Sequence, residues 1–200
     1  SRAPTGTSSR NPARTGLLIV EGWVPDYAFS TAIAAFHTNR YECVVVPGHS
    51  IAEGYHVSSW KTYARLGAET LKRMGFPEQK IALVEPANAI RDRTYSCGLA
   101  VREWMAVHYP SVRTVDLVSL NVHTRRTRYL YQKAFGEGYS VHSIAVPDGD
   151  YDSAHWWKTS SGFRKVTGEV IAYFYARFLF HPPAPRASGE SSPYKLAPKL

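Results

Sequence analysis

Residues 115–135 read VDLVSLNVHTRRTRYLYQKAF, and this stretch indicates the fold of the chain more clearly than any other. Its first part, residues 115–120, is a short apolar run that is typical of a buried strand. We expect the chain to turn through Asn121 and Val122 into a helix that opens at His123, with Asn121 as a residue type that caps helices. A strand that leads directly into a helix is half of a βαβ unit.

Three arginines, Arg125, Arg126 and Arg128, lie in the first two turns of this expected helix. The helix macrodipole favours cations at the C-terminus, so three cations at the N-terminus oppose it. A bound anion would relieve this conflict, because the free backbone N–H groups of a helix start attract anions. A solvated basic face is an alternative explanation for any one of the three.

Apolar runs and helical stretches alternate on both sides of this segment. They predict strands at residues 17–21, 42–47, 80–85, 112–120 and 139–146. They predict helices at residues 26–39, 58–74, 93–108, 123–135 and 165–178. Such alternation indicates a parallel sheet with helices on both faces. The fold class we expect is therefore α/β: a single Rossmann-like three-layer domain over residues 16–181, with a mostly parallel five-stranded sheet.

Both ends of the chain differ from this domain in composition. Residues 1–15 and 182–200 are rich in Ser, Pro and basic residues and are expected to be disordered. The two ends contribute +5 to the net charge of +8, so the domain has an excess of only +3. With no long basic run and no recognised module, we expect no nucleic-acid partner. Basic ends do favour adsorption to anionic surfaces such as phospholipid headgroups.

The two cysteines, Cys43 and Cys97, lack the CxxC spacing and the neighbouring histidines of a zinc site, so no metal is expected. We expect both to be buried apolar side chains, with a disulfide between them as the alternative. No segment reaches the roughly 18–20 apolar residues of a membrane span. The chain begins at Ser1 without a methionine, which leaves room for a preceding leader or membrane anchor.

Polar residues at the strand ends are the candidates for a ligand site, because parallel sheets bind ligands beyond their C-terminal strand ends. Glu21 ends the first strand and is the candidate base, although a cap of the next helix is an alternative role. Gly22 beside it, and Gly48 after the second strand, permit close backbone approach. His49 is either a ligand contact or a loop histidine. The chain has no GxGxxG, Walker A or GxSxG motif.

A second group of candidates follows the third predicted strand. Asn88 lies in a polar loop, and Thr94 or Asp92 is expected to cap the helix after it. Arg91 and Arg93 beside this helix start repeat the arrangement of basic residues at the start of the fourth predicted helix. Two such helix starts at neighbouring strand ends would converge on one crevice, which favours an anion site over a solvated basic face.

Two further features carry side chains suited to ligands. His123 and Arg126 are three residues apart and therefore share one helix face. Histidine donates to a phosphate or acts as acid and base, while arginine binds phosphate bidentately. Residues 150–157 form a loop before the last helix, in which Trp156 and Trp157 either cover an aromatic or lipid-like ligand or pack within the protein.

Four short motifs occur in order along the chain: VPG at residues 46–48, GFP at residues 75–77, RTYSCGLA at residues 93–100, and HxxR at His123 and Arg126. With these motifs the chain resembles the bacterial YdcF/SanA/ElyC-like family, a Rossmann-like domain of unknown function. The resemblance covers residues 16–181. The chain departs from the family pattern with EGW at residues 21–23 and with Arg93 where an asparagine is common, so it resembles a divergent branch.

The resemblance implies a role at the bacterial cell envelope. Relatives are linked to envelope integrity and to cell-wall precursor or lipid-carrier metabolism, and in one case to binding of S-adenosylmethionine. Many carry an N-terminal membrane anchor, which implies an inner-membrane location and a membrane association through a segment that precedes this chain. The resemblance carries no settled reaction, and S-adenosylmethionine is the one cofactor that it implies.

The leading hypothesis is a small anionic ligand, phosphate-bearing or nucleotide-like, or a phosphate-bearing lipid, bound at the C-terminal strand ends. Arg93 and Arg126 would hold the anion, and Thr94 would donate a hydrogen bond to it. His123 would orient or protonate the ligand, and Glu21 would be the base of a phosphoryl-ester or related group transfer. The other expected ligand contacts are Gly22, Gly48, His49, Asn88 and Asn121. The alternative is a non-catalytic, membrane-anchored envelope protein that recruits a protein partner.

Overall fold

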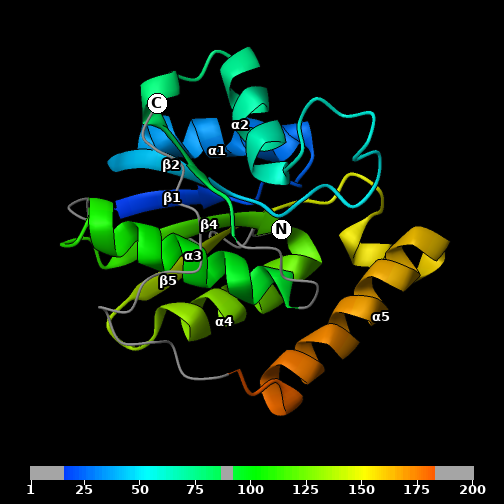
Figure 1. The fold of residues 1–200 in the computed structure, drawn as a ribbon. Helices are drawn as coiled ribbons and strands as arrows, with labels where there is room; N and C mark the ends of the chain where they lie inside the picture. The colour runs from blue at the N-terminus through cyan, green and yellow to red at the C-terminus, as the bar shows by residue number, and fades with distance from the viewer. Residues whose placement is uncertain (1–15, 87–91, 183–200) are drawn as a thin grey trace, which may run out of the picture.

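Strands and helices alternate along the chain as the sequence pattern predicts (Figure 1). The computed structural model describes residues 16–86 and 92–182. The strands are β1 (Gly16–Val20), β2 (Tyr41–Pro47), β3 (Ile81–Val84), β4 (Thr114–Leu120) and β5 (Ser140–Val146). The longer helices are α1 (Asp26–Thr38), α2 (Tyr63–Arg73), α3 (Arg93–His108), α4 (Asn121–Phe135) and α5 (Ser160–Phe174). Short helical segments are η1 (Glu78–Lys80), η2 (Ser153–Lys158) and the π-helical η3 (Tyr175–Leu179).

The sheet is parallel throughout the described residues, with strand order β3-β2-β1-β4-β5. β1 lies at its centre, where Leu18 pairs with Val44 of β2 on one side and with Asp116 of β4 on the other. The prediction of a single Rossmann-like α/β domain is confirmed. Because the strand order reverses beside β1, this is where a doubly wound sheet opens a crevice for a ligand.

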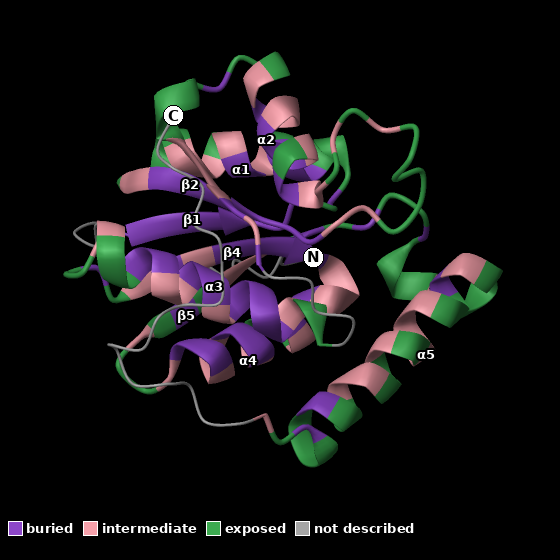
Figure 2. Cartoon of the chain, in the orientation of Figure 1, coloured by how far each residue is buried: buried purple, intermediate pink, exposed green. Residues whose placement is uncertain are grey.

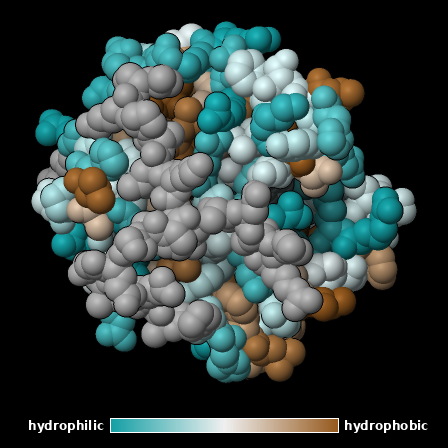
Figure 3. Space-filling model, viewed as in Figure 1, coloured by the Kyte–Doolittle hydropathy of each residue, from teal (hydrophilic) through white to brown (hydrophobic). Residues whose placement is uncertain are grey.

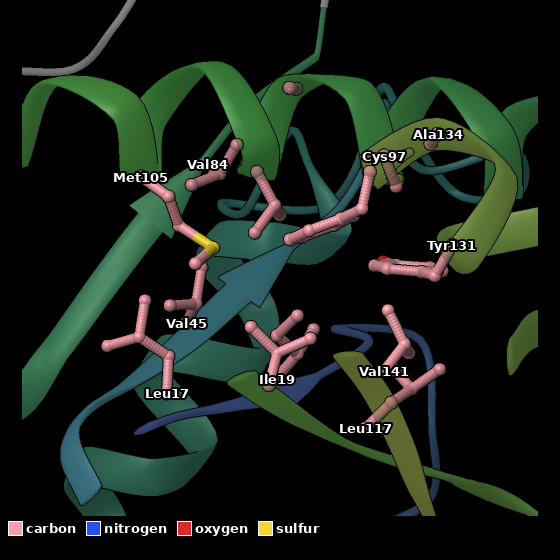
Figure 4. Close-up of a cluster of buried hydrophobic side chains, with 14 of the residues drawn as sticks. Leu17, Ile19, Val45, Val84, Cys97, Met105, Leu117, Tyr131, Ala134 and Val141 are labelled. Atoms are coloured by element: carbon pink, nitrogen blue, oxygen red, sulfur yellow. The ribbon is translucent and has the colours of Figure 1, made fainter. Parts of the chain in front are cut away.

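Two hydrophobic clusters cover the two faces of the sheet, because successive strand residues point to opposite faces. Leu17 and Ile19 of β1 pack with α3 and α4, in the cluster shown in Figure 4. Leu18 and Val20 pack with α1 and α2 on the other face. All four side chains are fully buried. Burial of each contributes roughly 1.5–3 kcal/mol, which explains why an uninterrupted apolar run forms the central strand.

The helices α3 and α4 approach each other closely at Gly98. A Cβ atom at this position would lie 2.9 Å from the Cβ of Ala134, so a larger side chain would force the two helices apart. Cys97 beside it and Cys43 of β2 are both buried, and no disulfide joins them. The prediction of two buried apolar cysteines is confirmed, and the alternative of a disulfide is wrong.

Two helices start at other residues than the sequence pattern predicts. α2 begins later than the predicted residue 58, and α5 begins earlier than the predicted residue 165. Both starts are set by a threonine that caps the helix. Thr62 accepts a hydrogen bond of 3.2 Å from the backbone N–H three residues later, and Thr159 does the same at 3.1 Å. Such a cap contributes about 1 kcal/mol, and hydrophobic periodicity does not reveal it.

The helix α4 follows β4 with no turn between them. The strand ends at Leu120 and the helix begins at Asn121, with Leu120 in the N-cap position. The prediction that Asn121 caps the helix is therefore wrong. Its side-chain amide instead donates a hydrogen bond of 2.5 Å to Ser153 Oγ in η2. His123 consequently lies within the first turn of α4 and does not open it.

The last helix, α5, lies beside α4 and continues into η3 (Figure 1). Figure 2 shows that most of its length is exposed or intermediate in burial. Over residues 16–86 and 92–182, no helix is both long enough and apolar enough to cross a bilayer. The disordered ends expected at residues 1–15 and 182–200 lie outside the described residues except for Pro182, and Asn88 and Arg91 lie outside them as well.

Candidate functional site

A cavity of about 530 Å³ lies where β1, β2 and β4 end and where α3 and α4 begin. Ligand cavities in proteins usually have volumes of roughly 300–1,000 Å³. The predicted site residues that line it are Glu21, Gly48, His49, Arg93, Thr94, His123 and Arg126. The other lining residues are Trp23, Pro47, Ala52, Tyr63, Asp92, Cys97 and Leu130. The structure thus brings together candidates from separate parts of the chain at the crevice of the sheet.

Gly22 and Gly48 allow the ends of β1 and β2 to touch the start of α2. A Cβ atom on Gly22 would lie 2.1 Å from the Tyr63 carbonyl oxygen, and one on Gly48 would lie 2.3 Å from the Ala64 nitrogen. Neither position has room for a side chain. Gly48 lines the cavity, whereas Gly22 is not part of the lining. For Gly22 the structure therefore shows a packing role.

Glu21 places a buried carboxyl group at the cavity. Burial raises the pKa of Glu21, and the charges of Arg126 and His123 and a hydrogen bond from the Trp23 side chain partly offset this, so that the pKa is about 7. The Oε2 atom has no hydrogen-bond partner among the described residues. A buried polar atom without a partner is costly, so it suits a place where a ligand donates a hydrogen bond. A pKa near neutrality suits proton transfer.

Arg126 is held by Glu169 of α5, a residue that no sequence pattern had indicated. Arg126 Nε donates to Glu169 Oε2 at 2.8 Å, and Nη2 donates to Oε1 at 2.9 Å. His123 Nδ1 also lies 2.8 Å from Glu169 Oε1, close enough for an ion pair but without hydrogen-bond geometry. Burial raises the pKa of Glu169, but the close contact with His123 and the hydrogen bonds and charge of Arg126 outweigh it and lower the pKa to about 2. Glu169 is therefore an internal anion beside the cavity.

The other arginines at the start of α4 also contact the protein. The Arg125 guanidinium lies 4.7 Å from the ring centroid of Tyr173, and Arg128 Nε donates to the Val141 carbonyl oxygen at 3.0 Å. Together with the Glu169 carboxylate, these contacts offset the unfavourable interaction between the three cations and the positive end of the helix dipole. At α4 the protein's own groups thus perform the role that the sequence assigned to a bound anion.

His49 supplies a second buried hydrogen-bond acceptor. Its Nε2 lies 2.8 Å from Ser96 Oγ and 3.2 Å from the Arg93 carbonyl oxygen. Because Ser96 Oγ donates to that same carbonyl at 2.9 Å, Nε2 carries the proton and Nδ1 the lone pair. Nδ1 is buried and has no partner among the described residues, and burial lowers the pKa of His49. The neutral ring can therefore accept a hydrogen bond from a ligand hydroxyl or amino group.

The helix α3 begins at the cavity without a side-chain cap. Asp92 occupies the N-cap position in the left-handed region, with φ 53° and ψ 39°, and its side chain makes no capping hydrogen bond. The predicted cap from Asp92 or Thr94 is therefore wrong. Arg93 lines the cavity, is exposed and has no ion pair with a described residue. The first turn of α3 thus combines open backbone N–H groups with a cation, two features that bind anions.

Some predicted contacts lie elsewhere, and some lining residues had not been predicted. Asn121 is bonded to η2 and is not part of the lining, and Asn88 lies outside the described residues. Trp23 and Tyr63 line the cavity, and the Trp23 ring meets the His123 ring edge-on at 5.4 Å between centroids. Trp23 lies three residues beyond the end of β1, so its position near a strand end was the signal that could have identified it.

The lining residues define the chemistry that the cavity supports. The described residues hold no group of three His, Cys, Asp or Glu side chains suited to a metal ion. Burial and the charge of Glu21 raise the pKa of Cys97 well above its usual value, so Cys97 is a thiol and not a nucleophilic thiolate. Two cations, Arg93 and Arg126, share the cavity with the acceptors of Glu21 and His49. This set suits a ligand that has both an anionic group and hydrogen-bond donors.

No family model, curated protein or solved structure matches the chain. Support for a function therefore comes from the fold and the geometry of the cavity. Membership of the YdcF/SanA/ElyC-like family stays a prediction. The HxxR motif on which it largely depends lies at the start of α4, with both of its residues in the lining.

Proposed function

We propose that the cavity binds a small phosphate-bearing molecule, and that the chain is a divergent YdcF/SanA/ElyC-like protein of the bacterial envelope. One observation carries the proposal: the cavity that is lined by two arginines also has two buried acceptors, Glu21 Oε2 and His49 Nδ1, without partners among the described residues. The arginines suit a phosphate, and the acceptors suit hydroxyl or amino groups on the rest of the ligand. A nucleotide-like molecule or a cell-wall precursor has groups of both kinds.

In this proposal the phosphate lies at the start of α3. Arg93 and the backbone N–H groups of the first helical turn bind it, and the Thr94 hydroxyl donates a further hydrogen bond. Arg126 contributes through Nη1, because its Nε and Nη2 are used by Glu169. The Arg93 guanidinium, which has no ion pair with a described residue, and the remaining N–H groups of Arg126 would therefore bind the same phosphate.

Glu21 gives the site a group that exchanges a proton near neutral pH, since its pKa is about 7. If the cavity is catalytic, phosphoryl-ester hydrolysis or a related group transfer fits best. Glu21 then accepts the proton of the attacking water or hydroxyl as its oxygen bonds to phosphorus. The ester oxygen leaves and takes a proton from His123, while the arginines stabilise the charge on the phosphate.

Thermal unfolding with a panel of ligands tests the proposal. The panel holds S-adenosylmethionine, nucleotides, sugar nucleotides, inorganic phosphate and short polyprenyl phosphates. A ligand at about 100 times its Kd stabilises the folded state by about 2.7 kcal/mol. At the same ligand concentration, Arg93→Ala should retain only about 1.4 kcal/mol, because its affinity should be about tenfold weaker. The matched control Arg40→Ala, at an exposed arginine next to the opposite end of β2, should keep the full stabilisation. Equal shifts in both variants, or no shift with any ligand, would contradict the proposal.

A second candidate is a non-catalytic envelope protein that recruits a protein partner. The exposed side chain of Trp157 in η2 favours it, because exposed tryptophans are common anchors of protein interfaces. Replacement of both Trp156 and Trp157 by alanine should then abolish capture of the partner and leave ligand binding in the cavity unchanged. Capture that survives both replacements would exclude this candidate.

A further inference from the structure

The side of α5 that is turned away from the domain is apolar. The exposed large side chains on it include Phe163, Val170, Ile171, Phe174 and, in η3, Phe178, each between 49% and 70% exposed. These five residues are called the α5 stripe below. Figure 3 shows hydrophobic side chains, in brown, at the lower right edge of the molecule, where α5 lies in Figure 1. Soluble monomers rarely expose so many neighbouring large apolar side chains without a function for them.

The α5 stripe forms one continuous helix face. Apart from the adjacent pair Val170 and Ile171, its members recur at intervals of three, four and seven residues, which is the repeat of one side of a helix. The opposite side faces the domain, where Glu169 bonds to Arg126 and Ala176 is buried. α5 is therefore an amphipathic helix whose acidic residue points inward and whose apolar face points outward. Apart from the Trp156 ring, which stacks on Phe163, the described residues leave the side chains of this face largely exposed.

The charges beside the α5 stripe are positive. Arg164 lies near its start and Arg177 near its end, and both are exposed and have no ion pair with a described residue. The Arg177 guanidinium lies 5.5 Å from the ring centroid of Tyr129 in α4. Lys165 is bonded to two aspartates of the preceding loop, so its charge is neutralised. Glu169, the acidic residue of α5, is turned inward. The exposed surface of α5 and η3 thus combines aromatic and aliphatic side chains with two cations at its edges.

A second copy of the chain does not complement this surface. If two α5 stripes packed antiparallel about the centre of residues 163–178, Arg164 of each copy would face Arg177 of the other. If they packed parallel, each arginine would face its own counterpart. Like charges across an interface oppose association. An anionic surface complements both arginines at once.

We propose that the α5 stripe lies flat on an anionic lipid bilayer. Its phenylalanines and aliphatic side chains enter the boundary between headgroups and acyl chains, as those of interfacial amphipathic helices do. Arg164 and Arg177 bind the headgroup phosphates. This inference does not depend on what the cavity binds. The same helix also holds Arg126 and His123 of the cavity through Glu169, so one helix connects the two surfaces.

Sedimentation of the full chain with lipid vesicles tests this proposal. The vesicles consist of phosphatidylcholine alone, or of phosphatidylcholine mixed with phosphatidylglycerol. The stripe variant carries Ile171→Ser, Phe174→Ser and Phe178→Ser. The matched control carries Val57→Ser and Val107→Ser, at two exposed valines outside α5. All of these side chains are exposed, so both variants should fold, and circular dichroism verifies this.

We expect the wild type and the control to bind the vesicles that contain phosphatidylglycerol, and the stripe variant to bind them at least about tenfold more weakly. Arg164→Ala with Arg177→Ala should also weaken binding by about tenfold and reduce its dependence on salt. The phosphatidylcholine vesicles should bind the wild type more weakly than the anionic ones.

Three results would overturn the proposal. One is that the stripe variant binds as the wild type does, because the basic ends of the chain would then account for binding. Another is that the wild type binds neither kind of vesicle. The third is a concentration-dependent dimer, seen by light scattering, that the stripe variant abolishes, because a second copy of the chain would then cover the stripe.

Discussion

The starts of α3 and α4 share a sequence pattern but differ in how their cations are used. Both helices begin at the cavity, and both place an arginine in its lining. At α4, Arg126 is bonded through two nitrogens to Glu169, and His123 lies beside the same carboxylate. At α3, Arg93 is exposed and has no ion pair with a described residue.

This difference shows that the position of an arginine at a helix start does not reveal whether its charge is available to a ligand. The α4 start is a closed arrangement, in which the Glu169 carboxylate of α5 occupies the position that a bound ligand anion would take. The α3 start is an open arrangement, in which Arg93 has no ion pair with a described residue and the Asp92 side chain makes no capping hydrogen bond. Ligand binding should therefore depend on α3, and stability should depend on α4.

The largest expected effect concerns Glu21, whose carboxyl group is influenced by the charges at the α4 start. Its pKa is about 7 in the folded protein, against an ordinary value of 4.5. Between these pH values the folded state holds more protons than the unfolded state, so stability falls as the pH rises from about 4.5 to 7. The fall amounts to roughly 3 kcal/mol. Glu21→Gln should remove it and be more stable than the wild type at pH 8.

Urea unfolding of both proteins at pH 5 and pH 8 measures this effect. The wild type should lose stability between the two pH values, while Glu21→Gln should change much less. If the variant shows the same loss as the wild type, then Glu21 is not the group that titrates, and its assignment as a proton acceptor of the cavity fails.

A change at Glu169 should convert the closed α4 start into an open one. Glu169→Gln removes the internal anion, which should cost about 2 kcal/mol of stability because Arg126 loses its partner in a partly buried place. The same variant should bind sulfate more tightly, since Arg126 and His123 become available. Urea unfolding at neutral pH with and without sulfate measures both effects.

The pH dependence of this effect has the opposite sign to that of Glu21. The pKa of Glu169 is lowered to about 2 from 4.5, so its contribution is full above about 4.5 and is lost as the pH falls toward 2. Glu78→Gln, which breaks an exposed ion pair with Lys72, is the control and should cost less than about 1 kcal/mol. Equal losses in the two variants would show that the α4 start is not held by Glu169.

A change at Arg93 should affect binding and leave stability unchanged. Arg93→Ala removes an exposed side chain without an ion pair among the described residues, so the free energy of unfolding should change by less than about 0.5 kcal/mol. Its affinity for a phosphate-bearing ligand should fall about tenfold, because a charge-assisted contact is lost. Isothermal titration of the wild type and the variant compares the affinities. Unchanged affinity would mean that α3 is not the open site.

The smallest expected effect sharpens the same comparison with an arginine that lies outside the cavity. Arg125 is exposed on α4 and stacks over the ring of Tyr173. Arg125→Ala should lower stability by about 0.5–1 kcal/mol, the usual value of an exposed cation–π contact. Its ligand affinity should equal that of the wild type in the same titration. A tenfold loss of affinity would indicate that the binding of anions is spread over α4 as well.

The fold could be predicted because buried strands require short runs of apolar residues, which are visible in the sequence. The runs LLIV and VVV are long enough for buried strands and too short for helices, and helical stretches separate them. The starts of α2 and α5 could not be placed, because they depend on Thr62 and Thr159 accepting backbone hydrogen bonds. A threonine in the sequence does not show whether its hydroxyl caps a helix or faces solvent.

Much of the candidate site could be predicted because the C-terminal ends of parallel strands lie at one edge of a sheet, whatever the strand order. Glu169 could not be predicted, since it is 43 residues from Arg126 and reaches it only through the packing of α5 beside α4. The open Nδ1 of His49 could not be predicted either, because the position of its proton depends on Ser96.

The most direct test of the open α3 site is an NMR titration of backbone amides with inorganic phosphate at pH 6, where Glu21 is largely protonated. We expect saturable shifts of the amide signals of Arg93, Thr94 and Tyr95 in the wild type, and we expect the shifts in Arg93→Ala to need about ten times more phosphate. Amides at the start of α4 should shift less, because Glu169 already occupies Arg126. If the α3 amides do not respond while other regions do, the cavity does not bind anions at α3 and the account is wrong.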